Sequence, residues 1–406
     1  MVQVGLVSKT TRTMAASPAF SSAPSLELAI NLHTNDDGDA GIESHSSQPQ
    51  KLAEAEFVEF HPGRHLNFTP PSKVYTMAEL GYPERRGISP VGVSEPFPMF
   101  STEAIQIMRK EALGDEVFAK YHYSGDLAKG QLRGYAAECA PFVYDAWKHP
   151  QTLAIVSKIA GVDLVPVMDY EIGHINISVQ SEEDKVKFLA AVVETKSQDA
   201  GKSVPDGSWE DKDPIVDWHT DGYHFVCVVM LSDCKDMIGG ETELRKGNGE
   251  TIKIRGPKMG SAVILQGRYI EHRALHALGM TERITMVTSF RPRSPAIPDH
   301  TVLTTIRPIS ALGELYHQFA EYRFEILEDR LRGVNKYMQA RKRSNRRFNT
   351  GYLKQFIREQ IEFLEHMDRE IVEDDKVIKG VTGDSHLISE DLKLKHSKKS
   401  ELSAAQ

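Results

Sequence analysis

The most informative part of this sequence is the segment Asp217-Trp218-His219-Thr220-Asp221, together with the later His272. Residues 216–220 have the composition of a β-strand, and on a strand side chains two positions apart point to the same side. We therefore expect His219 and Asp221 to lie close enough to bind one ion. An imidazole, a carboxylate and a second imidazole form a 2-His-1-carboxylate set, which binds iron(II) and leaves coordination positions open.

Short strands and tight turns surround this segment from residue 215 to residue 291. The strand candidates are rich in β-branched residues and are separated by glycine-containing turns: Val216–Thr220, Phe225–Leu231, Thr242–Arg245, Thr251–Ile254, Ser261–Leu265 and Arg283–Phe290. Strands this short at this spacing predict a β-sandwich or barrel. A further strand or hairpin is predicted over Val165–Val179.

The last of these strands carries a second pair of polar side chains, Arg283 and Thr285. They are two positions apart and so share one face of the strand. A guanidinium beside a hydroxyl makes a good clamp for a carboxylate. Arg291 is the competing candidate for such a clamp.

With these residues, the sequence resembles the iron(II)/2-oxoglutarate-dependent oxygenase superfamily, and its fungal members in particular. The matching elements, in the family's order and spacing, are the HxD pair His219 and Asp221, the distal His272, and the R-x-T pair Arg283 and Thr285. The stretch that begins at Tyr170 and runs Tyr-Glu-Ile-Gly resembles the strand that precedes HxD in this family. The resemblance covers roughly residues 165–295.

The resemblance implies an α+β protein whose core is a double-stranded β-helix, a jelly-roll or cupin-like fold, flanked by helices. It implies Fe(II), 2-oxoglutarate and O2 as cofactors, with Fe(II) held by His219, Asp221 and His272. Arg283 and Thr285 would bind the far carboxylate of 2-oxoglutarate. Tyr170 suits either a place near the co-substrate or packing in the core. The implied reaction is oxidation of a C–H bond by hydroxylation, desaturation or cyclisation, with release of succinate and CO2. The substrate would be a small organic molecule, such as an amino acid or an intermediate of secondary metabolism.

Several alternatives stay open on the sequence. An iron oxidase of the same fold would use no 2-oxoglutarate, and a non-catalytic jelly-roll binding module would bind no metal. His276 competes with His272, because two histidines four positions apart on a helix are also found in zinc hydrolases. Position 273 is Arg, however, where those enzymes have their general-base Glu. Asn176 suits either the pocket or a turn, whereas His174 and His224 suit structural roles better than the pocket wall.

Composition excludes other classes of protein. The chain has 406 residues, 40% of them hydrophobic, and a formal net charge of −8. The negative charge argues against a general nucleic-acid partner, and no apolar run is long enough to predict a membrane span. The three cysteines, Cys139, Cys227 and Cys234, form no CxxC pair, which argues against a disulfide framework or a zinc-thiolate site. We therefore expect a cytoplasmic protein with a small-molecule substrate.

The sequence also predicts how the chain is organised around this core. The predicted parts are a flexible tail at 1–50, a catalytic domain at 51–305 with its β-core at about 165–295 and a helical or lid insertion at 180–214, C-terminal helices at 306–375, and a flexible tail at 376–406. An organelle-targeting segment is the rival interpretation of the first tail. Helices are predicted after Ser101 or Thr102, over roughly 132–147, and over 151–159 with an end at Gly161. Each C-terminal helix has one apolar stripe, which suits packing on the core or on a partner chain, as in a homodimer.

Overall fold

The computed structural model describes residues 58–83, 85–179, 214–235, 237–254, 258–275, 277–278 and 282–383. The predicted N-terminal tail, nearly all of the predicted insertion, His276 and the chain after residue 383 lie outside these residues.

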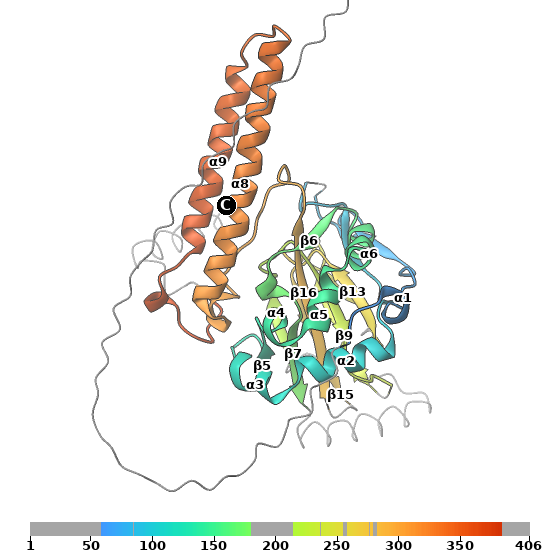
Figure 1. The fold of residues 1–406 in the computed structure, drawn as a ribbon. Helices are drawn as coiled ribbons and strands as arrows, with labels where there is room; N and C mark the ends of the chain where they lie inside the picture. The colour runs from blue at the N-terminus through green and yellow to red at the C-terminus, as the bar shows by residue number, and fades with distance from the viewer. Residues whose placement is uncertain are drawn as a thin grey trace, which may run out of the picture. The chain divides into compact units, whose positions relative to one another are not determined.

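Within the described residues, ten strands form a large antiparallel sheet (Figure 1). They are β1 (Val74–Thr76), β2 (Val91–Ser94), β3 (Phe97–Pro98), β4 (His122–Tyr123), β5 (Gly130–Leu132), β6 (Leu164–Pro166), β7 (His174–Val179), β9 (Phe225–Met230), β13 (Ser261–Leu265) and β16 (Glu282–Pro292). The order is β1-β2-β13-β9-β16-β7-β5-β4, with β3 beside β13 and β6 beside β16. All five residues of β13 are buried, as expected for a central strand covered on both faces.

A smaller antiparallel sheet of four described strands carries the metal-site motif. Its strands are β8 (Val216–His219), β11 (Thr242–Arg245), β12 (Thr251–Ile254) and β14 (His272–Ala274), in the order β12-β11-β14-β8. A two-stranded ribbon joins β10 (Ile238–Gly239) to β15 (Ala277–Leu278). Side chains of both larger sheets, such as Leu244 and Leu265, share one apolar cluster, so the sheets pack face to face.

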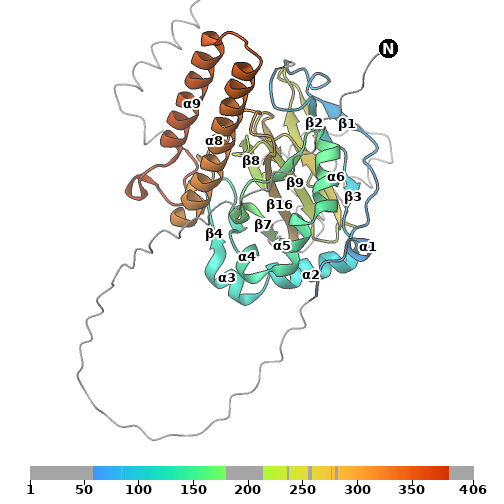
Figure 2. The ribbon, with the colours of Figure 1, turned by 45° about the horizontal axis from the view of Figure 1, so that its top comes forward.

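Helices cover the other face of the large sheet (Figure 2). They are α1 (Pro62–His65), α2 (Thr102–Ala112), α3 (Asp115–Tyr121), α4 (Ala136–Cys139), α5 (Pro141–Lys148) and α6 (Pro150–Ala160). Ser101 caps α2 by accepting a hydrogen bond from the amide of Ala104, and Gly161 ends α6 with a φ of 69°. Trp147 packs edge-on against Phe290 of β16 at 6.1 Å, so the helical layer shares one core with the sheet.

Two sequence predictions need correction here. The predicted helix over 132–147 is split: Leu132 belongs to β5, and the helical part breaks at Ala140 before Pro141. Proline lacks the amide hydrogen that would continue the first helix, so it starts a new one. The predicted strand over Val165–Val179 is also divided, because a short 3-10 helix, η1 (Asp169–Glu171), separates β6 from β7.

After the sheets, the chain forms η2 (Arg307–Ile309), then two long helices, α8 (Leu312–Arg343) and α9 (Thr350–Glu370), and finally η3 (Asp374–Lys376). Figure 1 shows α8 and α9 as an antiparallel hairpin. The first turns of α8 join the core through an apolar cluster that contains Leu315 and Phe319 of α8 and Val167 and Tyr170 before β7. Among the helices of the described segments, none combines the length and the apolar character needed to cross a bilayer.

Candidate metal centre

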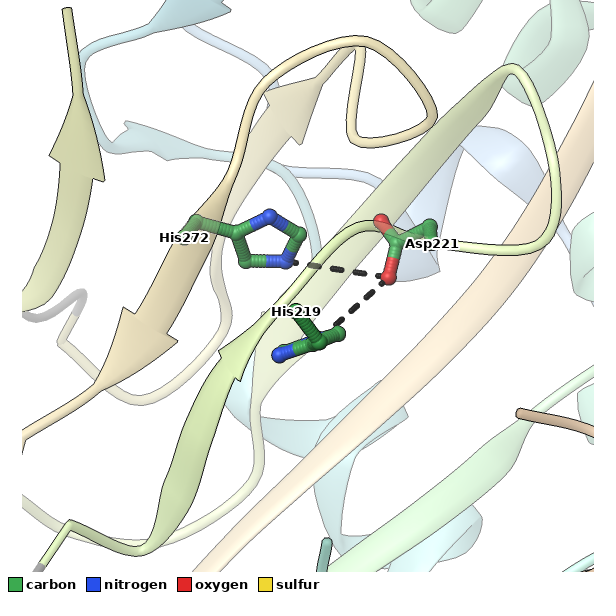
Figure 3. Close-up of side chains that lie close together, drawn as sticks. All are labelled: His219, Asp221 and His272. Atoms are coloured by element: carbon green, nitrogen blue, oxygen red, sulfur yellow. Dashed lines mark ion pairs between the residues drawn. The ribbon is translucent and has the colours of Figure 1, made fainter. Parts of the chain in front are cut away.

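Two paired strands place two histidines side by side. His272 of β14 is the direct antiparallel partner of His219 of β8. The two rings lie 4.3 Å apart between centroids, on the same side of the small sheet (Figure 3). Cross-strand partners in an antiparallel pair always present their side chains to one face. The register of β8 against β14 therefore brings together residues that are 53 positions apart in the sequence.

Asp221 completes the group from just beyond the end of β8. Its Oδ1 lies 3.6 Å from Nε2 of His219 and 3.6 Å from Nε2 of His272. Within the described residues, these three side chains are the one cluster of His, Cys, Asp or Glu whose candidate ligand atoms all lie within 4.8 Å of one another. The amide of Asp221 donates to the carbonyl oxygen of Gly267 at 3.0 Å, which fixes the loop that carries the carboxylate.

The hydrogen bonds around these side chains suit a metal ion. Nδ1 of His219 donates to the carbonyl oxygen of Asp217 at 2.7 Å, and Nδ1 of His272 donates to that of Ile270 at 3.0 Å. With the proton on Nδ1, each Nε2 keeps a free lone pair that faces Asp221. Oδ2 of Asp221 is buried and has no hydrogen-bond partner among the described residues. Two imidazole nitrogens and an otherwise unpaired carboxylate are a donor set for a divalent ion such as Fe(II).

Burial and mutual charge shift the pKa values of all three groups. Burial, assisted by the neighbouring His219, lowers the pKa of His272 to about 4. Burial also opposes protonation of His219, but Asp221 outweighs it, so the pKa of His219 lies above its ordinary value. Burial would raise the pKa of Asp221, yet His272 and His219 hold it below the ordinary value. A carboxylate and at least one neutral imidazole are thus present near neutral pH, as metal binding requires.

A cavity between the two sheets connects this group to β16. Every second residue from 283 to 289 of that strand lines it: Arg283, Thr285, Val287 and Ser289. The same cavity is lined by His219, Asp221 and His272. The alternation of side chains along β16 therefore puts the predicted carboxylate clamp and the predicted metal ligands into one space.

Arg283 is an unusual side chain for this position, because it is buried and has no acidic partner among the described residues. Only 7% of it is exposed, its Nε has no hydrogen-bond partner, and its Nη2 makes one long hydrogen bond, of 3.4 Å, to the carbonyl oxygen of Gly240. Burial lowers the pKa of the guanidinium. A buried cation without a counter-charge costs folding free energy, so an anion bound in the cavity would be stabilised there.

Another part of the cavity wall holds a buried ion pair that the sequence did not reveal. Nη2 of Arg133 donates to Oε1 of Glu171, and the hydroxyl of Tyr223 donates to the same oxygen at 3.0 Å. Arg133 and Glu171 are 3% and 2% exposed, and all three side chains line the cavity. The pair is neutral as a unit, so it presents hydrogen-bonding groups without net charge.

His174 extends this polar wall. Its Nε2 lies 3.1 Å from Oε1 of Gln131, and its Nδ1 lies 3.5 Å from Nη1 of Arg133. Burial and then the charge of Arg133 lower the pKa of His174 well below its ordinary value, so the ring is neutral at physiological pH. Asn176, the next residue to point the same way on β7, also lines the cavity. No sequence pattern pointed to this wall, because Arg133 fell inside the wrongly predicted helix over 132–147.

Other candidates from the sequence lie away from the cavity lining. The hydroxyl of Tyr170 accepts from the amide of Ala311 at 2.9 Å, so its ring lies in the apolar cluster under α8. Its role near a co-substrate stays a prediction that this placement does not support. Arg291 lines a separate hollow beside α8, with its guanidinium 5.0 Å from the ring centre of Tyr322. His224 is fully buried and accepts from the amide of His300 at 3.0 Å, which is a structural role.

The zinc-hydrolase alternative depended on a helix through His272 and His276. The structure has a strand, β14 (His272–Ala274), at that place. Side chains of a strand do not return to one side every four residues as they do on a helix turn, so the helical spacing argument was wrong. His276 itself lies outside the described residues.

Comparisons with known proteins give remote likenesses only. No family model and no curated protein matches the sequence. Among solved structures, an oxidoreductase of the 2OG-Fe(II) oxygenase family from Burkholderia pseudomallei has 12% identity and a TM-score of 0.28, over 43% of this chain and 76% of that one. A Pseudomonas putida prolyl-4-hydroxylase has 14% identity and a TM-score of 0.27, over 55% and 99%. The non-heme alpha-ketoglutarate-dependent epimerase SnoN from nogalamycin biosynthesis has 11% identity and a TM-score of 0.33, over 54% and 84%. Similarity this low establishes neither a family nor a reaction for this chain.

Proposed function

We propose that this chain is an Fe(II)/2-oxoglutarate-dependent oxygenase built on a double-stranded β-helix, of the fungal type that its sequence resembles. One observation carries the proposal: Arg283, a buried guanidinium with no acidic partner among the described residues, lines the same cavity as the group of His219, Asp221 and His272. A dicarboxylate with a 2-oxo acid at one end satisfies both features. The 2-oxo acid end chelates a metal, and the far carboxylate neutralises the guanidinium.

Each side chain then has a definite task. His219, Asp221 and His272 would hold Fe(II) through two Nε2 atoms and one carboxylate oxygen. When bound, the metal supplies activation of O2 for oxidation of a C–H bond. Arg283 and Thr285 orient 2-oxoglutarate by its far carboxylate. The apolar wall of Val226, Val228, Val263, Leu265 and Val287 excludes water from the reacting groups.

The electron balance explains why 2-oxoglutarate is needed in addition to the substrate. Reducing O2 takes four electrons, and oxidation of one C–H bond supplies only two of them. Oxidative decarboxylation of 2-oxoglutarate to succinate and CO2 supplies the other two. The oxidised substrate would be a small organic molecule, and the polar wall of Arg133, Glu171 and His174 suits one with a hydrogen-bonding group. Hydroxylation, desaturation and cyclisation share this balance and differ in how the substrate lies.

The decisive experiment adds Fe(II) and then 2-oxoglutarate to the full chain without oxygen and records the visible spectrum. A 2-oxo acid that chelates Fe(II) gives a metal-to-ligand charge-transfer band. We expect this band in the wild type, and a much higher 2-oxoglutarate requirement in Arg283→Met. Arg291→Met is the matched control, because Arg291 lies outside the cavity, and it should titrate like the wild type.

Three outcomes would reject the proposal. Folded, iron-loaded protein that shows no such band does not bind 2-oxoglutarate through the metal. Oxygen consumption on a pool of small metabolites without release of succinate would instead select an oxidase that takes all four electrons from its substrate. Failure to bind any iron after reconstitution would leave the fold as a binding module.

A further inference from the structure

The α8–α9 hairpin carries an apolar face that the rest of the described structure leaves uncovered. Twelve large apolar side chains of the described residues are exposed, and eight of them fall between residues 324 and 371. Five of these lie within α8 and α9 at the spacing of one helix face, and they are 40–53% exposed: Phe324 and Leu331 of α8, and Ile357, Ile361 and Leu364 of α9. Solvent-exposed apolar stripes of this length are uncommon on single helices and indicate a contact surface.

The exposed side chains of both helices lie on one face of the hairpin. Phe324 directly follows Arg323, whose Nη2 donates to the carbonyl oxygen of Phe363 at 2.9 Å, and Leu364 directly follows Phe363. One residue turns a helix by about 100°. α8 and α9 run in opposite directions. Seen along one common axis, advancing by one residue therefore turns the side chain counterclockwise on one helix and clockwise on the other. Both stripes therefore rotate to the same side, and together they make one apolar face two helices wide.

The hairpin is also strongly polarised in charge along its length. Residues 330–358, here called the basic tip, contain ten Lys or Arg and no Asp or Glu. Residues 312–329 and 359–375, here called the acidic base, contain thirteen Asp or Glu and two Arg. Two hairpins side by side in parallel would place like charges together, whereas an antiparallel arrangement places each basic tip beside an acidic base.

We propose that this face binds a second copy of this chain, with the two hairpins antiparallel and related by a two-fold axis. A two-fold contact is self-complementary, and a surface that is basic at one end and acidic at the other meets that requirement. A polyanion such as a nucleic acid or an anionic membrane suits the basic tip but is repelled by the acidic base of the same face. The four helices would pack through these five apolar side chains of each copy as in a four-helix bundle.

The expected contact area is consistent with a concentration-dependent dimer. α9 has 21 residues and is thus roughly 32 Å long. A contact of that length, two helices wide at about 9 Å per helix, covers on the order of 600 Å² of each copy. The total of about 1,200 Å² is at the lower limit for specific interfaces, so charge pairing contributes a large share of the affinity and salt should weaken it.

The test is analytical ultracentrifugation of the full chain over a range of concentrations at low and high salt. We expect a monomer–dimer equilibrium with weaker association at high salt. Leu364→Glu should raise the dissociation constant of the dimer roughly tenfold or more. A two-fold interface contains the substituted residue twice, once from each copy. Phe118→Glu is the matched control, since Phe118 is an exposed apolar residue of α3, away from the hairpin, and should leave the equilibrium unchanged.

A charge exchange distinguishes self-association from attraction to another partner. Lys342 lies on the apolar face three turns after Leu331, within the basic tip, and Asp368 lies one turn after Leu364, within the acidic base. Lys342→Glu and Asp368→Lys should each weaken the dimer, and the double variant should regain most of the lost affinity. A wild type that stays monomeric at low salt and high concentration, with or without binding to DNA or anionic vesicles, would overturn the proposal. So would a dimer that neither Leu364→Glu nor the charge variants affect.

Discussion

A Cβ atom added at Gly267 would lie 1.8 Å from Oδ2 of Asp221. The carbonyl oxygen of the same glycine accepts the amide hydrogen of Asp221 at 3.0 Å. The loop before β14 thus holds the backbone of Asp221 and leaves room for its carboxylate only because residue 267 has no side chain. The pair makes Gly267 a positioning residue for the predicted metal site, although it binds no metal itself.

We predict that Gly267→Ala lowers the affinity for iron by roughly 10–100-fold while the protein stays folded. A methyl group at this position must displace the carboxylate of Asp221. Mutation of a residue that orients a metal ligand typically lowers the metal affinity 10–100-fold. Iron content after reconstitution, with circular dichroism for the fold, measures both effects. Gly313→Ala is the matched control, because a Cβ atom there meets nothing within 4 Å. An iron affinity equal to that of the wild type in Gly267→Ala would contradict a role of Asp221 as a ligand.

Arg283→Met should have opposite effects on the free and the liganded protein. Methionine fills a similar volume without a charge, so the ligand-free variant should be at least as stable as the wild type. The stabilisation that 2-oxoglutarate gives to the metal-loaded wild type should disappear in the variant, since ligand binding no longer favours the folded state. Thermal unfolding with Fe(II) or a redox-inert substitute, with and without 2-oxoglutarate, tests this. Equal stabilisation of both proteins would remove Arg283 from the co-substrate site.

Glu171→Gln should destabilise the protein by about 3–5 kcal/mol, because it leaves the buried guanidinium of Arg133 without its counter-charge. Tyr223→Phe removes one hydrogen bond to the same oxygen and should cost only about 1 kcal/mol. Denaturant unfolding measures both values. The double variant Arg133→Met/Glu171→Met should be less destabilised than the sum of its single changes, and simple additivity would contradict a coupled pair.

His224 should make the free energy of unfolding depend on pH between about 6.5 and about 4. Burial lowers the pKa of His224 to about 4, despite the nearby Asp299, whereas an unfolded histidine has a pKa near 6.5. As the pH falls through this window, the unfolded chain takes up a proton that the folded protein does not, so folding stability is lost, by up to roughly 3 kcal/mol. The same stability is fully present above pH 6.5.

The variant His224→Gln isolates this contribution. Glutamine keeps an acceptor for the amide of His300 but does not titrate, so its unfolding free energy should fall less steeply over the same pH range. The difference between the two proteins is the quantity to measure, because other buried histidines titrate in both. Asp299, whose pKa is held at about 2 by His224 and Arg323 against the effect of burial, contributes only below about pH 4. Parallel curves for the two proteins would show that His224 has an ordinary pKa in the fold.

Local patterns in the sequence determined much of the fold. Alternation and turn residues gave the bounds of β11, β12 and β13 as the structure has them, and Ser101 and Gly161 marked the start of α2 and the end of α6. These features depend on hydrogen bonds and side-chain directions within a few residues of one another. The same local rule placed Arg283 and Thr285 on one face of β16. Where local signals conflicted, as around Pro141, the predicted helix was wrong.

Only the tertiary structure decided which distant residues meet. The register of β8 against β14 puts His272 opposite His219, and the loop at Gly267 holds Asp221 between them. The pairing of Arg133 with Glu171 also arises from packing of the two sheets, and so does the burial of Arg283 without an acidic partner among the described residues. Strand register and burial depend on the summed free energy of many long-range contacts, which no short stretch of sequence contains. The sequence by itself therefore determined which chemical groups are present and which strand face they occupy, and the sheets decided what those groups contact.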